Sequence, residues 1–196
     1  MPPESAPVTV IIPAYRARET IGRALAGIAA QTVRPRQVVV VDDGSDDGTV
    51  AAAEACAADL GDIDLDVLQQ SHAGAGAARN RALLAAREEI VAFLDADDEW
   101  LPTHLERSLF HLQSGDYVLV AHNGWQIEDG GESLIDGARR FAEGDDAFVS
   151  LYRKGYIDTC TVVARRQAII DAGGFDPALP NAQDFDMWLA LLRRPG

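Results

Sequence analysis

Three carboxylates lie within four residues in the segment Asp95-Ala96-Asp97-Asp98. They follow the apolar run Ile90–Leu94, whose branched and aromatic residues predict a buried strand. Acids crowded at one strand end repel one another unless a cation compensates for their charge. A hard divalent ion, shared between these oxygens and a substrate phosphate, would do so. A solvated acidic turn, with an Asp capping the helix after Pro102, explains the same residues without a ligand.

A second acidic turn, Asp42-Asp43-Gly44-Ser45, follows the four-valine run Val38–Val41. Two carboxylates at a strand end can accept hydrogen bonds from a nucleobase imide or from a ribose. Pro13-Ala14-Tyr15 follows a third apolar run, Val8–Ile12, and could place Tyr15 beside a flat ring. Both segments also have interpretations without a ligand: a capped turn, and a Pro that ends a strand beside a packing Tyr.

Two later segments offer an arginine and further acids. The small-residue turn His72–Asn80 enters a predicted helix, and its Arg79 could bind a diphosphate or form an exposed ion pair. Its Gly-x-Gly spacing follows the third predicted strand rather than the first, which argues against a dinucleotide-binding motif. Asp184 and Asp186 stand at the start of an apolar helix, where either could act as a base or cap the helix.

The elements that must position these residues alternate between strands and helices through the first half of the chain. This order predicts a parallel sheet with right-handed crossovers and helices on both faces. Ligands bind outside the carboxyl ends of such strands, so both acidic turns should face one edge. Residues 128–146 are polar and are expected to form a turn, Asp129-Gly130-Gly131, and a flexible loop. The predicted strands are Val8–Ile12, Val38–Val41, Leu65–Gln69, Ile90–Leu94, Tyr117–Ala121 and Thr159–Val163, and the predicted helices are Thr20–Gln31, Thr49–Leu60, Gly76–Ala86, Pro102–Gln113, Arg165–Ala172 and Phe185–Leu192.

Composition narrows the classes of function. A chain of 196 residues, 47% of them hydrophobic and 24% charged, predicts one soluble globular domain. A net charge of -14 without a basic stretch argues against nucleic-acid binding. No apolar run approaches the length of a membrane span, and the first residues lack the layout of a signal peptide. The two cysteines, Cys56 and Cys160, and the four histidines show no metal-ligand spacing, and a reducing, cytoplasmic setting is expected.

In their order along the chain, six motifs resemble those of the family 2 glycosyltransferases, which have the GT-A fold. The resemblance runs from Val8 to about Leu192. It implies an α/β fold with a mostly parallel central sheet flanked by helices, in a single catalytic domain. Residues 1–101 would form the nucleotide-sugar-binding half and 102–196 the acceptor-side half, which we expect to be cut short at its carboxyl end. The motifs are Val10–Tyr15, Val41–Ser45, Ala78–Asn80, Phe93–Asp98, Gly173–Asp176 and Asp184–Leu189.

On the donor side, the resemblance implies binding of a nucleotide-diphosphate sugar, most often a UDP-sugar. Asp43 matches the residue that contacts the base, and Pro13 and Tyr15 match the wall around it. Arg79 belongs to the third motif and is available to bind the diphosphate, and Asp95 matches a carboxylate on the ribose or metal side.

On the catalytic side, the resemblance implies an inverting transfer of the sugar to an acceptor hydroxyl. Asp97 matches the ligand that holds Mn²⁺ or Mg²⁺ against the diphosphate, and Asp184 matches the catalytic base. The chain departs from the family at Gln183, where Glu is common, and at Ala190, where Arg is common. These departures put activity and acceptor choice in question.

The expected partners are the sugar donor and a carbohydrate or lipid-linked acceptor. Many relatives build cell-surface polysaccharides, so we expect this protein to act in the cytoplasm, at the inner face of the cell membrane. Two alternatives remain: a nucleotide-sugar-binding relic without catalysis, favoured by Ala190, and a nucleotidyltransferase. The segment Pro13–Glu19 lacks the Gly-rich, basic loop that nucleotidyltransferases favour after their first strand.

Overall fold

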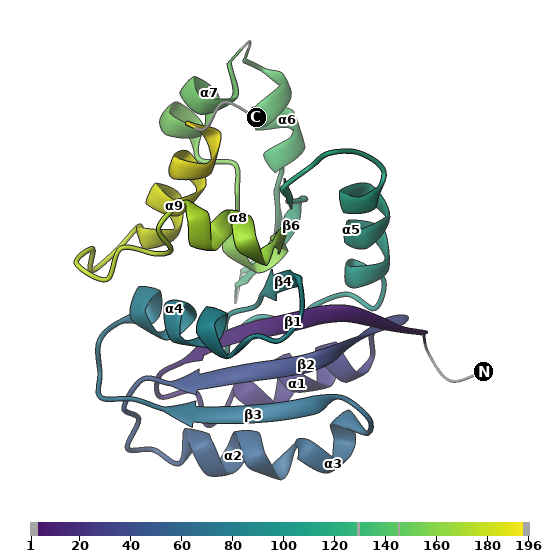
Figure 1. The fold of residues 1–196 in the computed structure, drawn as a ribbon, viewed down its shortest axis with the longest axis vertical. Helices are drawn as coiled ribbons and strands as arrows, with labels where there is room; N and C mark the ends of the chain where they lie inside the picture. Colours follow the sequence, from purple (N-terminus) through teal and green to yellow (C-terminus); the bar gives the residue numbers. More distant parts are fainter. Residues whose placement is uncertain (1–3, 129, 145, 194–196) are drawn as a thin grey trace.

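The computed structural model describes residues 4–128, 130–144 and 146–193 (Figure 1). Asp129, in the turn predicted above, and the final Arg194-Pro195-Gly196 lie outside these ranges. Four neighbouring strands of the central sheet run parallel, and the two strands at one side, β8 and β5, pair antiparallel to their neighbours. The predicted α/β class, with a mostly parallel central sheet flanked by helices, is confirmed. In order across the sheet the strands are β3 (Asp64–Gln69), β2 (Val33–Asp42), β1 (Glu4–Ala14), β4 (Ile90–Phe93), β8 (Val163–Arg165) and β5 (Leu119–Val120).

Helices cover both faces of this sheet, as Figure 1 shows for the first three strands. One face packs against α1 (Ile21–Ala29), α2 (Thr49–Ala55), α3 (Ala57–Leu60) and α5 (His104–Gln113). The other packs against α4 (Ala75–Ala85), α8 (Arg166–Asp171) and α9 (Gln183–Leu192). Successive strand residues point to opposite faces, so a strand covered on both sides reads as a continuous apolar run.

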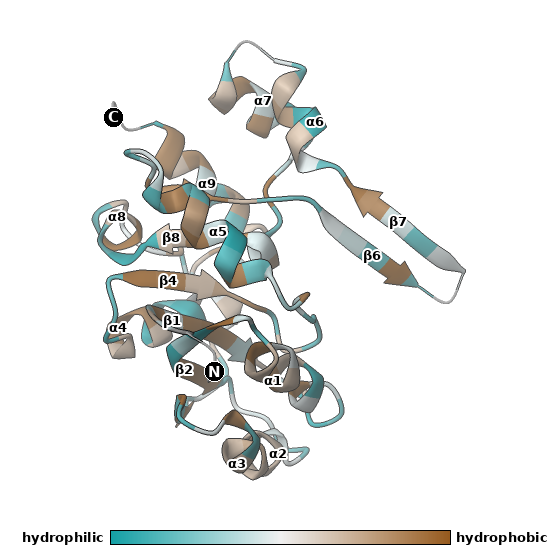
Figure 2. Cartoon of the chain, turned by 90° about the vertical axis from the view of Figure 1, so that its right-hand side faces the viewer, coloured by the Kyte–Doolittle hydropathy of each residue, from teal (hydrophilic) through white to brown (hydrophobic). Residues whose placement is uncertain are grey.

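The remaining elements belong to the second half of the chain. β6 (Gly124–Glu128) and β7 (Gly131–Ile135) form a separate two-stranded hairpin, which projects from the body in Figure 2. The helices α6 (Gly137–Ala142) and α7 (Ala147–Lys154) follow, and a 3₁₀ turn, η1 (Thr159–Thr161), leads into β8. Among the described helices, none combines the length and the apolar character that a membrane crossing requires.

Three expectations about these elements are wrong. Pro13 does not end the first strand, because β1 continues to Ala14. The β4 side of β1 is paired only up to Ile11, so the missing N–H of Pro13 interrupts no bond there. The helix expected over residues 49–60 is divided at Cys56 into α2 and α3. The loop expected over residues 128–146 contains a strand and a helix, and Trp125 and Leu134 face each other across its hairpin.

Candidate functional site

Four carboxylates from three separate segments meet at the carboxyl edge of the parallel strands, and we call them the acidic centre. Asp95 and Asp98 follow β4, Asp158 precedes η1, and Asp184 lies in the first turn of α9. The charges of Asp95 and Asp184 both act on Asp158, and that of Asp95 acts on Asp98. β8 runs antiparallel to β4, so the residues that precede it lie beside those that follow β4.

The tightest part of the acidic centre is a group of three possible ligand atoms. The carboxylate oxygens of Asp95 and Asp98 and the Sγ atom of Cys160 all lie within 4.8 Å of one another. The thiol of Cys160 donates to Asp98 Oδ2 at 2.6 Å, and the backbone N–H of Asp95 donates to Cys160 Sγ at 3.4 Å. Carboxylate oxygens are the donors that Mg²⁺ and Mn²⁺ prefer, so the oxygens of this group fit the predicted cation.

Asp97, the predicted metal ligand, lies on the same turn but is not part of that group. Asp97 is exposed, and its backbone carbonyl accepts a long hydrogen bond from Arg23 Nη2 at 3.5 Å. The interpretation that an Asp of this turn caps the helix after Pro102 is wrong, because α5 begins at His104. Its N-cap residue is Thr103, which makes no side-chain capping bond, so helix capping does not explain the acidic turn.

The electrostatics of the acidic centre favour binding of a cation. Removal from water raises the pKa of Asp158, and the charges of Asp95 and Asp184 raise it further. Asp98 is exposed as a whole residue, but its Oδ2 atom lies against the buried Cys160, and loss of water raises its pKa as well. Both shifts show that the ionised carboxylates are destabilised here, and a bound cation would reverse that effect.

Arg79 supplies the positive charge that the acidic centre contains. Its Nη2 atom lies 2.6 Å from Asp95 Oδ1, and its guanidinium stands over the ring of Phe175 at 5.6 Å. The Arg79 side chain is only 5% exposed, so the alternative of an exposed ion pair is wrong. A buried ion pair holds its partner in one orientation, so Arg79 fixes the direction of the Asp95 carboxylate.

Asp184 is held by two hydrogen bonds in the first turn of α9. The buried hydroxyl of Thr159 donates to Oδ2 at 2.8 Å, and the backbone N–H of Phe185 donates to Oδ1 at 2.8 Å. The N-cap of α9 is Ala182, with φ of 58°, so neither Asp184 nor Asp186 caps this helix. The capping interpretation of these acids is therefore wrong, and Asp184 sits in the acidic centre with free lone pairs.

Asp43 is buried at the end of β2, where the turn after β3 surrounds its carboxylate. Oδ1 accepts from Gln70 Nε2 at 2.7 Å and from the backbone N–H of Ala73 at 2.9 Å. Oδ2 accepts from the backbone N–H of Gly74 at 2.8 Å and lies 2.9 Å from His72 Nδ1. Asp43 therefore holds this turn, and His72 is the residue of the turn that it presents outward, with 60% of the side chain exposed.

Tyr15 completes this edge of the site. The residue is 46% exposed, and its ring lies 4.4 Å from the His72 ring, centroid to centroid. The structure brings Tyr15, Asp43 and His72 together, whereas Pro13 is buried within β1. Exposed aromatic rings of this kind offer a stacking surface to a flat ligand ring.

Sequence reasoning missed Asp158, Thr159 and His72 as site residues. The segment around Thr159 was expected to be a strand, and the antiparallel direction of β8 was not expected. The order of elements alone carries no signal for that direction, because it depends on pairing between residues about 70 apart in the sequence. The acids of the two turns, in contrast, could be placed from the apolar runs before them.

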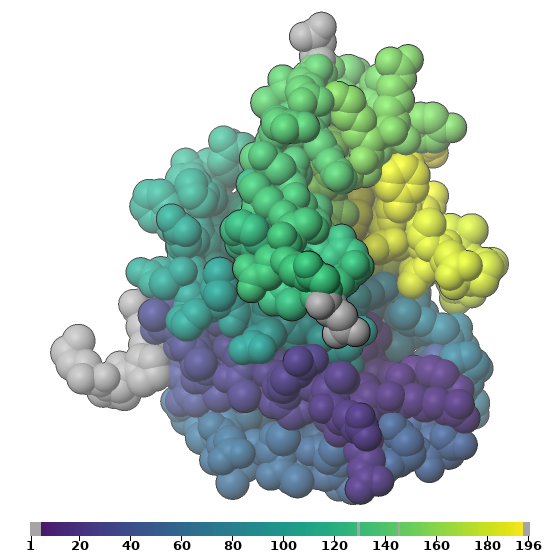
Figure 3. Space-filling view, turned by 180° about the vertical axis from the view of Figure 1, so that it is seen from behind, coloured from purple at the N-terminus to yellow at the C-terminus, as the bar shows by residue number. Residues whose placement is uncertain are grey.

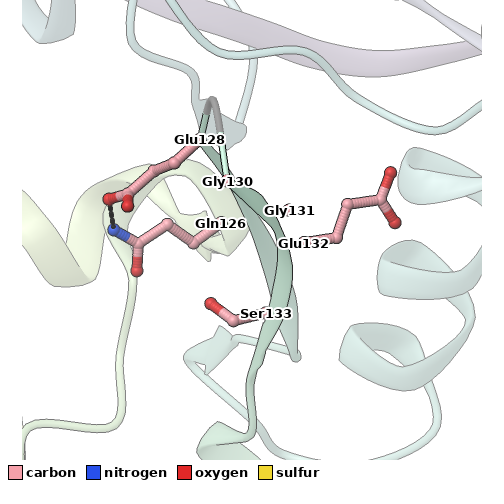
Figure 4. Close-up of a pocket in the computed structure, with 6 residues that line it drawn as sticks. All are labelled: Gln126, Glu128, Gly130, Gly131, Glu132 and Ser133. Atoms are coloured by element: carbon pink, nitrogen blue, oxygen red, sulfur yellow. Dashed lines mark hydrogen bonds between the residues drawn. The ribbon is translucent and has the colours of Figure 1, made fainter.

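The pocket drawn in Figure 4 lies along the β6–β7 hairpin and contains none of the predicted site residues. In Figure 4 the Gln126 side chain donates to Glu128 at 2.7 Å, while Glu132 points to the opposite side. Figure 3 shows the green residues of the hairpin and α6 between the teal α5 and the yellow α9. The pocket offers no converging set of catalytic groups, so we place the functional site at the acidic centre.

A pair of histidines lies beside the acidic centre. His104 is stacked on Trp100 at 4.0 Å, and Trp100 Nε1 donates to the carbonyl of Cys160 at 2.7 Å. His122 Nδ1 lies 2.8 Å from the carbonyl of Asn123, which accepts only, so the proton of His122 is on Nδ1. Its Nε2 atom lies 2.6 Å from His104 Nδ1, so the two rings share one hydrogen bond.

We predict that His104 makes the stability of the protein depend on pH. Burial lowers the pKa of His104 to about 3, and His122 acts in the same direction. In the unfolded chain the His104 ring binds a proton near pH 6.5, whereas in the folded protein it stays neutral to a much lower pH. The free energy of unfolding is therefore unaffected by His104 above about pH 6.5. The free energy of unfolding then falls by about 1.4 kcal/mol per pH unit as the pH drops from about 6.5 towards 3.

Urea unfolding at pH 7 and at pH 4.5 tests this prediction. The free energy of unfolding should fall less between these two pH values in His104→Leu than in the parent. His111→Leu, an exposed position on the same helix, is the control, and equal losses in all three proteins would contradict the prediction.

Comparison with known proteins identifies the family and the fold of this chain. The family model described as Glycosyl transferase family 2 matches residues 9–173. An uncharacterized glycosyltransferase of Nostoc sp. is 37% identical over 134 residues, which is 67% of this chain and 40% of that protein. The amylovoran biosynthesis glycosyltransferase AmsB of Erwinia amylovora is 28% identical over 186 residues, 91% of this chain and 62% of AmsB. The chain thus spans less than two thirds of the length of these relatives.

Solved structures show the same fold. Residues 1–349 of TarS from S. aureus, in complex with UDP-GlcNAc, match with a TM-score of 0.70 at 22% identity, covering 94% of this chain and 53% of that one. The mannosyltransferase PcManGT of Pyrobaculum calidifontis, in complex with GDP-Man and Mn²⁺, matches with a TM-score of 0.68 at 25% identity, covering 92% and 50%. The predicted family and fold are therefore confirmed, and this chain belongs to glycosyl transferase family 2.

Proposed function

We propose that this chain is the catalytic part of an inverting glycosyltransferase that moves a sugar from a UDP-sugar to an acceptor hydroxyl, with a divalent metal. The observation that carries the proposal is the convergence of Asp95, Asp98, Asp158 and Asp184 at one edge of the sheet, in a chain of this family. Acids from three segments, two with raised pKa values, are arranged for binding a cation and moving a proton.

Asp184 is the proposed catalytic base. Its carboxylate would take the proton of the acceptor hydroxyl as the acceptor oxygen bonds to the anomeric carbon. The bond from that carbon to the diphosphate breaks in the same step, and its electron pair leaves with the nucleoside diphosphate. Attack opposite the leaving group inverts the anomeric centre. Thr159 holds the carboxylate in place through the bond to Oδ2.

The turn after β4 is the proposed metal site. Asp95 and Asp98 offer carboxylate oxygens in the group defined above, and Asp97 offers a third carboxylate from the same turn. Mn²⁺ or Mg²⁺ bound there would neutralise the negative charge that grows on the departing diphosphate. The Mn²⁺ in the PcManGT complex supports a divalent ion. Arg79 keeps Asp95 oriented and adds positive charge next to it.

The base of the nucleotide is proposed to lie against Tyr15 and His72. Asp43 would act here by holding the turn that carries His72, because its own carboxylate oxygens are already engaged by that turn. The nucleotides in the TarS and PcManGT complexes, UDP-GlcNAc and GDP-Man, support a nucleotide-sugar donor. We propose uracil as the base, on the family resemblance.

We further propose a carbohydrate or lipid-linked acceptor and a role in building an envelope polysaccharide, in the cytoplasm at the inner face of the membrane. The assignment of AmsB to amylovoran biosynthesis supports such a role for this chain.

A panel of ligands tests the proposal. The melting temperature would be measured with UDP-, GDP- and dTDP-sugars, each with Mn²⁺ and with EDTA. We expect a UDP-sugar to stabilise the protein in the presence of Mn²⁺, by about 2.7 kcal/mol at a concentration 100 times Kd. Stabilisation by UTP with a sugar phosphate, and release of pyrophosphate, would instead identify a nucleotidyltransferase. Absence of any nucleotide effect would contradict the proposed function.

A further inference from the structure

We propose that Asn80, on α4, is a positioning residue that holds the base-bearing helix α9 in place relative to Asp95. The inference rests on the proposed function, since it takes Asp184 as the catalytic base. Asn80 lies in the proposed donor half of the chain and touches neither reacting group. Its side chain forms hydrogen bonds with the backbone of Phe175, 95 residues later in the sequence.

The Asn80 side chain binds one backbone unit on both sides. Its Nδ2 atom donates to the carbonyl of Phe175 at 2.6 Å, and its Oδ1 atom accepts from the backbone N–H of Phe175 at 2.9 Å. The amide therefore pairs with Phe175 as a neighbouring strand would. Gly174 is fitted to this contact, because its φ is +72° and a Cβ atom there would lie 2.7 Å from Asn80 Oδ1.

The Phe175 side chain links this pairing to both parts of the site. Its ring packs edge-on against Phe93 at 5.5 Å and against Trp188 at 5.8 Å, between centroids. Phe93 ends β4, two residues before Asp95, and Trp188 lies one turn after Asp184 on α9. The Phe175 ring also lies under the guanidinium of Arg79, which binds Asp95.

The connection between Phe175 and α9 has no comparable anchor. Among the described residues, the hydrogen bonds of segment 176–182 run within the segment or to α9: Ala178 and Leu179 bond to Asp176, and Asp186 bonds to Ala182. The pairing with Asn80 is thus the last hydrogen-bonded fixed point before Asp184. Loss of it would let the start of α9 move relative to Asp95 while both halves keep their folds.

A small displacement of this kind affects turnover more than donor binding. A shift of the base by about 1 Å can cost on the order of 100-fold in rate, because the proton must pass over hydrogen-bond distance. The donor would be held mainly by the turn after β4 and by Tyr15 and His72, which do not depend on α9. A lower kcat with an unchanged Kd for UDP is therefore the expected signature.

The test compares Asn80→Asp with a matched control, Gln37→Glu. Asn80→Asp keeps the shape and the acceptor for Phe175 N–H but places an oxygen against the Phe175 carbonyl. Gln37 is also a buried bridging amide, and its Nε2 atom donates to the carbonyl of Ala85 at 3.2 Å, at the amino end of the sheet. Gln37 Nε2 also donates to Asp66 Oδ2 at 2.7 Å, so Gln37→Glu opposes two acceptors at once and is the more disruptive change, at the edge of the sheet opposite to the acidic centre.

We expect Asn80→Asp to lower kcat for UDP release from a UDP-sugar by about 10- to 100-fold, with a Kd for UDP within about twofold of the parent value. Hydrogen exchange should rise in residues 173–190 and stay unchanged in β1 to β4. Gln37→Glu should leave kcat and exchange in residues 173–190 unchanged. Asn80→Ser, which replaces the amide by a single shorter hydroxyl group, should show an intermediate effect and serves if Asn80→Asp does not fold.

Equal kcat values for Asn80→Asp and Gln37→Glu, or unchanged exchange in residues 173–190, would overturn the inference. A parent protein that releases no UDP would instead contradict the proposed function. The exchange measurement still tests the role of Asn80 in that case, because it requires no turnover.

Discussion

Asp184→Asn is expected to lower the release of UDP from a UDP-sugar, in the presence of Mn²⁺, by about 10²- to 10⁴-fold. The amide is nearly the same shape as the carboxylate and can still accept the hydrogen bond from Thr159, but it cannot take a proton from an acceptor hydroxyl or from water. The fold should be unaffected, and the Kd for UDP should stay within about twofold, since the base is not a proposed donor ligand. Coupled detection of UDP measures the rate, and calorimetry measures the Kd.

Asp186→Asn provides the matched control for this experiment. Asp186 lies on the same first turn of α9 but is exposed, so its variant should keep the parent rate. Thr159→Val and Thr159→Ser separate the role of the supporting hydroxyl, since only Ser keeps a donor for Asp184. If Asp184→Asn releases UDP as fast as the parent while UDP still binds, the protein is a nucleotide-sugar-binding relic and the catalytic proposal is wrong.

Asp95→Asn is expected to remove the Mn²⁺-dependent part of UDP binding and to destabilise the fold. The loss of one carboxylate from the metal site should raise the Kd for UDP in Mn²⁺ at least about tenfold, towards the value in EDTA. The change also leaves the buried guanidinium of Arg79 without its charged partner. Because a third of the Asp95 side chain is exposed, we expect a cost of about 1–3 kcal/mol in the free energy of unfolding.

Electron paramagnetic resonance of Mn²⁺ measures metal binding directly and without turnover. Asp97→Asn and Asp98→Asn, measured in the same way, assign the ligands of the turn: the geometry groups Asp98 with Asp95, whereas the family resemblance names Asp97. Asp46→Asn, at an exposed ion pair with Arg16, is the control that should change neither quantity. Unchanged Mn²⁺ binding in all three site variants would show that this turn is not a metal site.

Much of the first half of the chain could be predicted because its strands are covered on both faces. Val38–Val41 and Ile90–Leu94 are fully buried, and an unbroken apolar run is the pattern of a buried parallel strand. Once those runs are strands, the acids that follow them must lie at the carboxyl edge of the sheet. The hairpin β6–β7 was missed because a two-stranded ribbon on the surface buries little and has a weak apolar pattern.

The second half of the chain could not be predicted in the same way. Asp158 and Thr159 reach the acidic centre only because β8 runs antiparallel to β4, which brings its preceding residues to the carboxyl edge. Whether Arg79 would be exposed or buried depended on Phe175, which comes from a segment almost 100 residues away. Local periodicity carries no information on such contacts, since it reports only which face of an element is apolar.

The sequence by itself determined the α/β class, the four parallel strands and the two acidic turns, because each depends on short runs of neighbouring residues. The tertiary structure decided which side chains surround each carboxylate. Asp98 lies with Asp95 and the thiol of Cys160, and Asp184 lies with Asp158 and the hydroxyl of Thr159. It also decided that Asp43 supports His72 and that Arg79 orients Asp95. These partners are set by the direction of β8 and by the packing of α9 on the sheet, where burial and long-range hydrogen bonds outweigh any local preference.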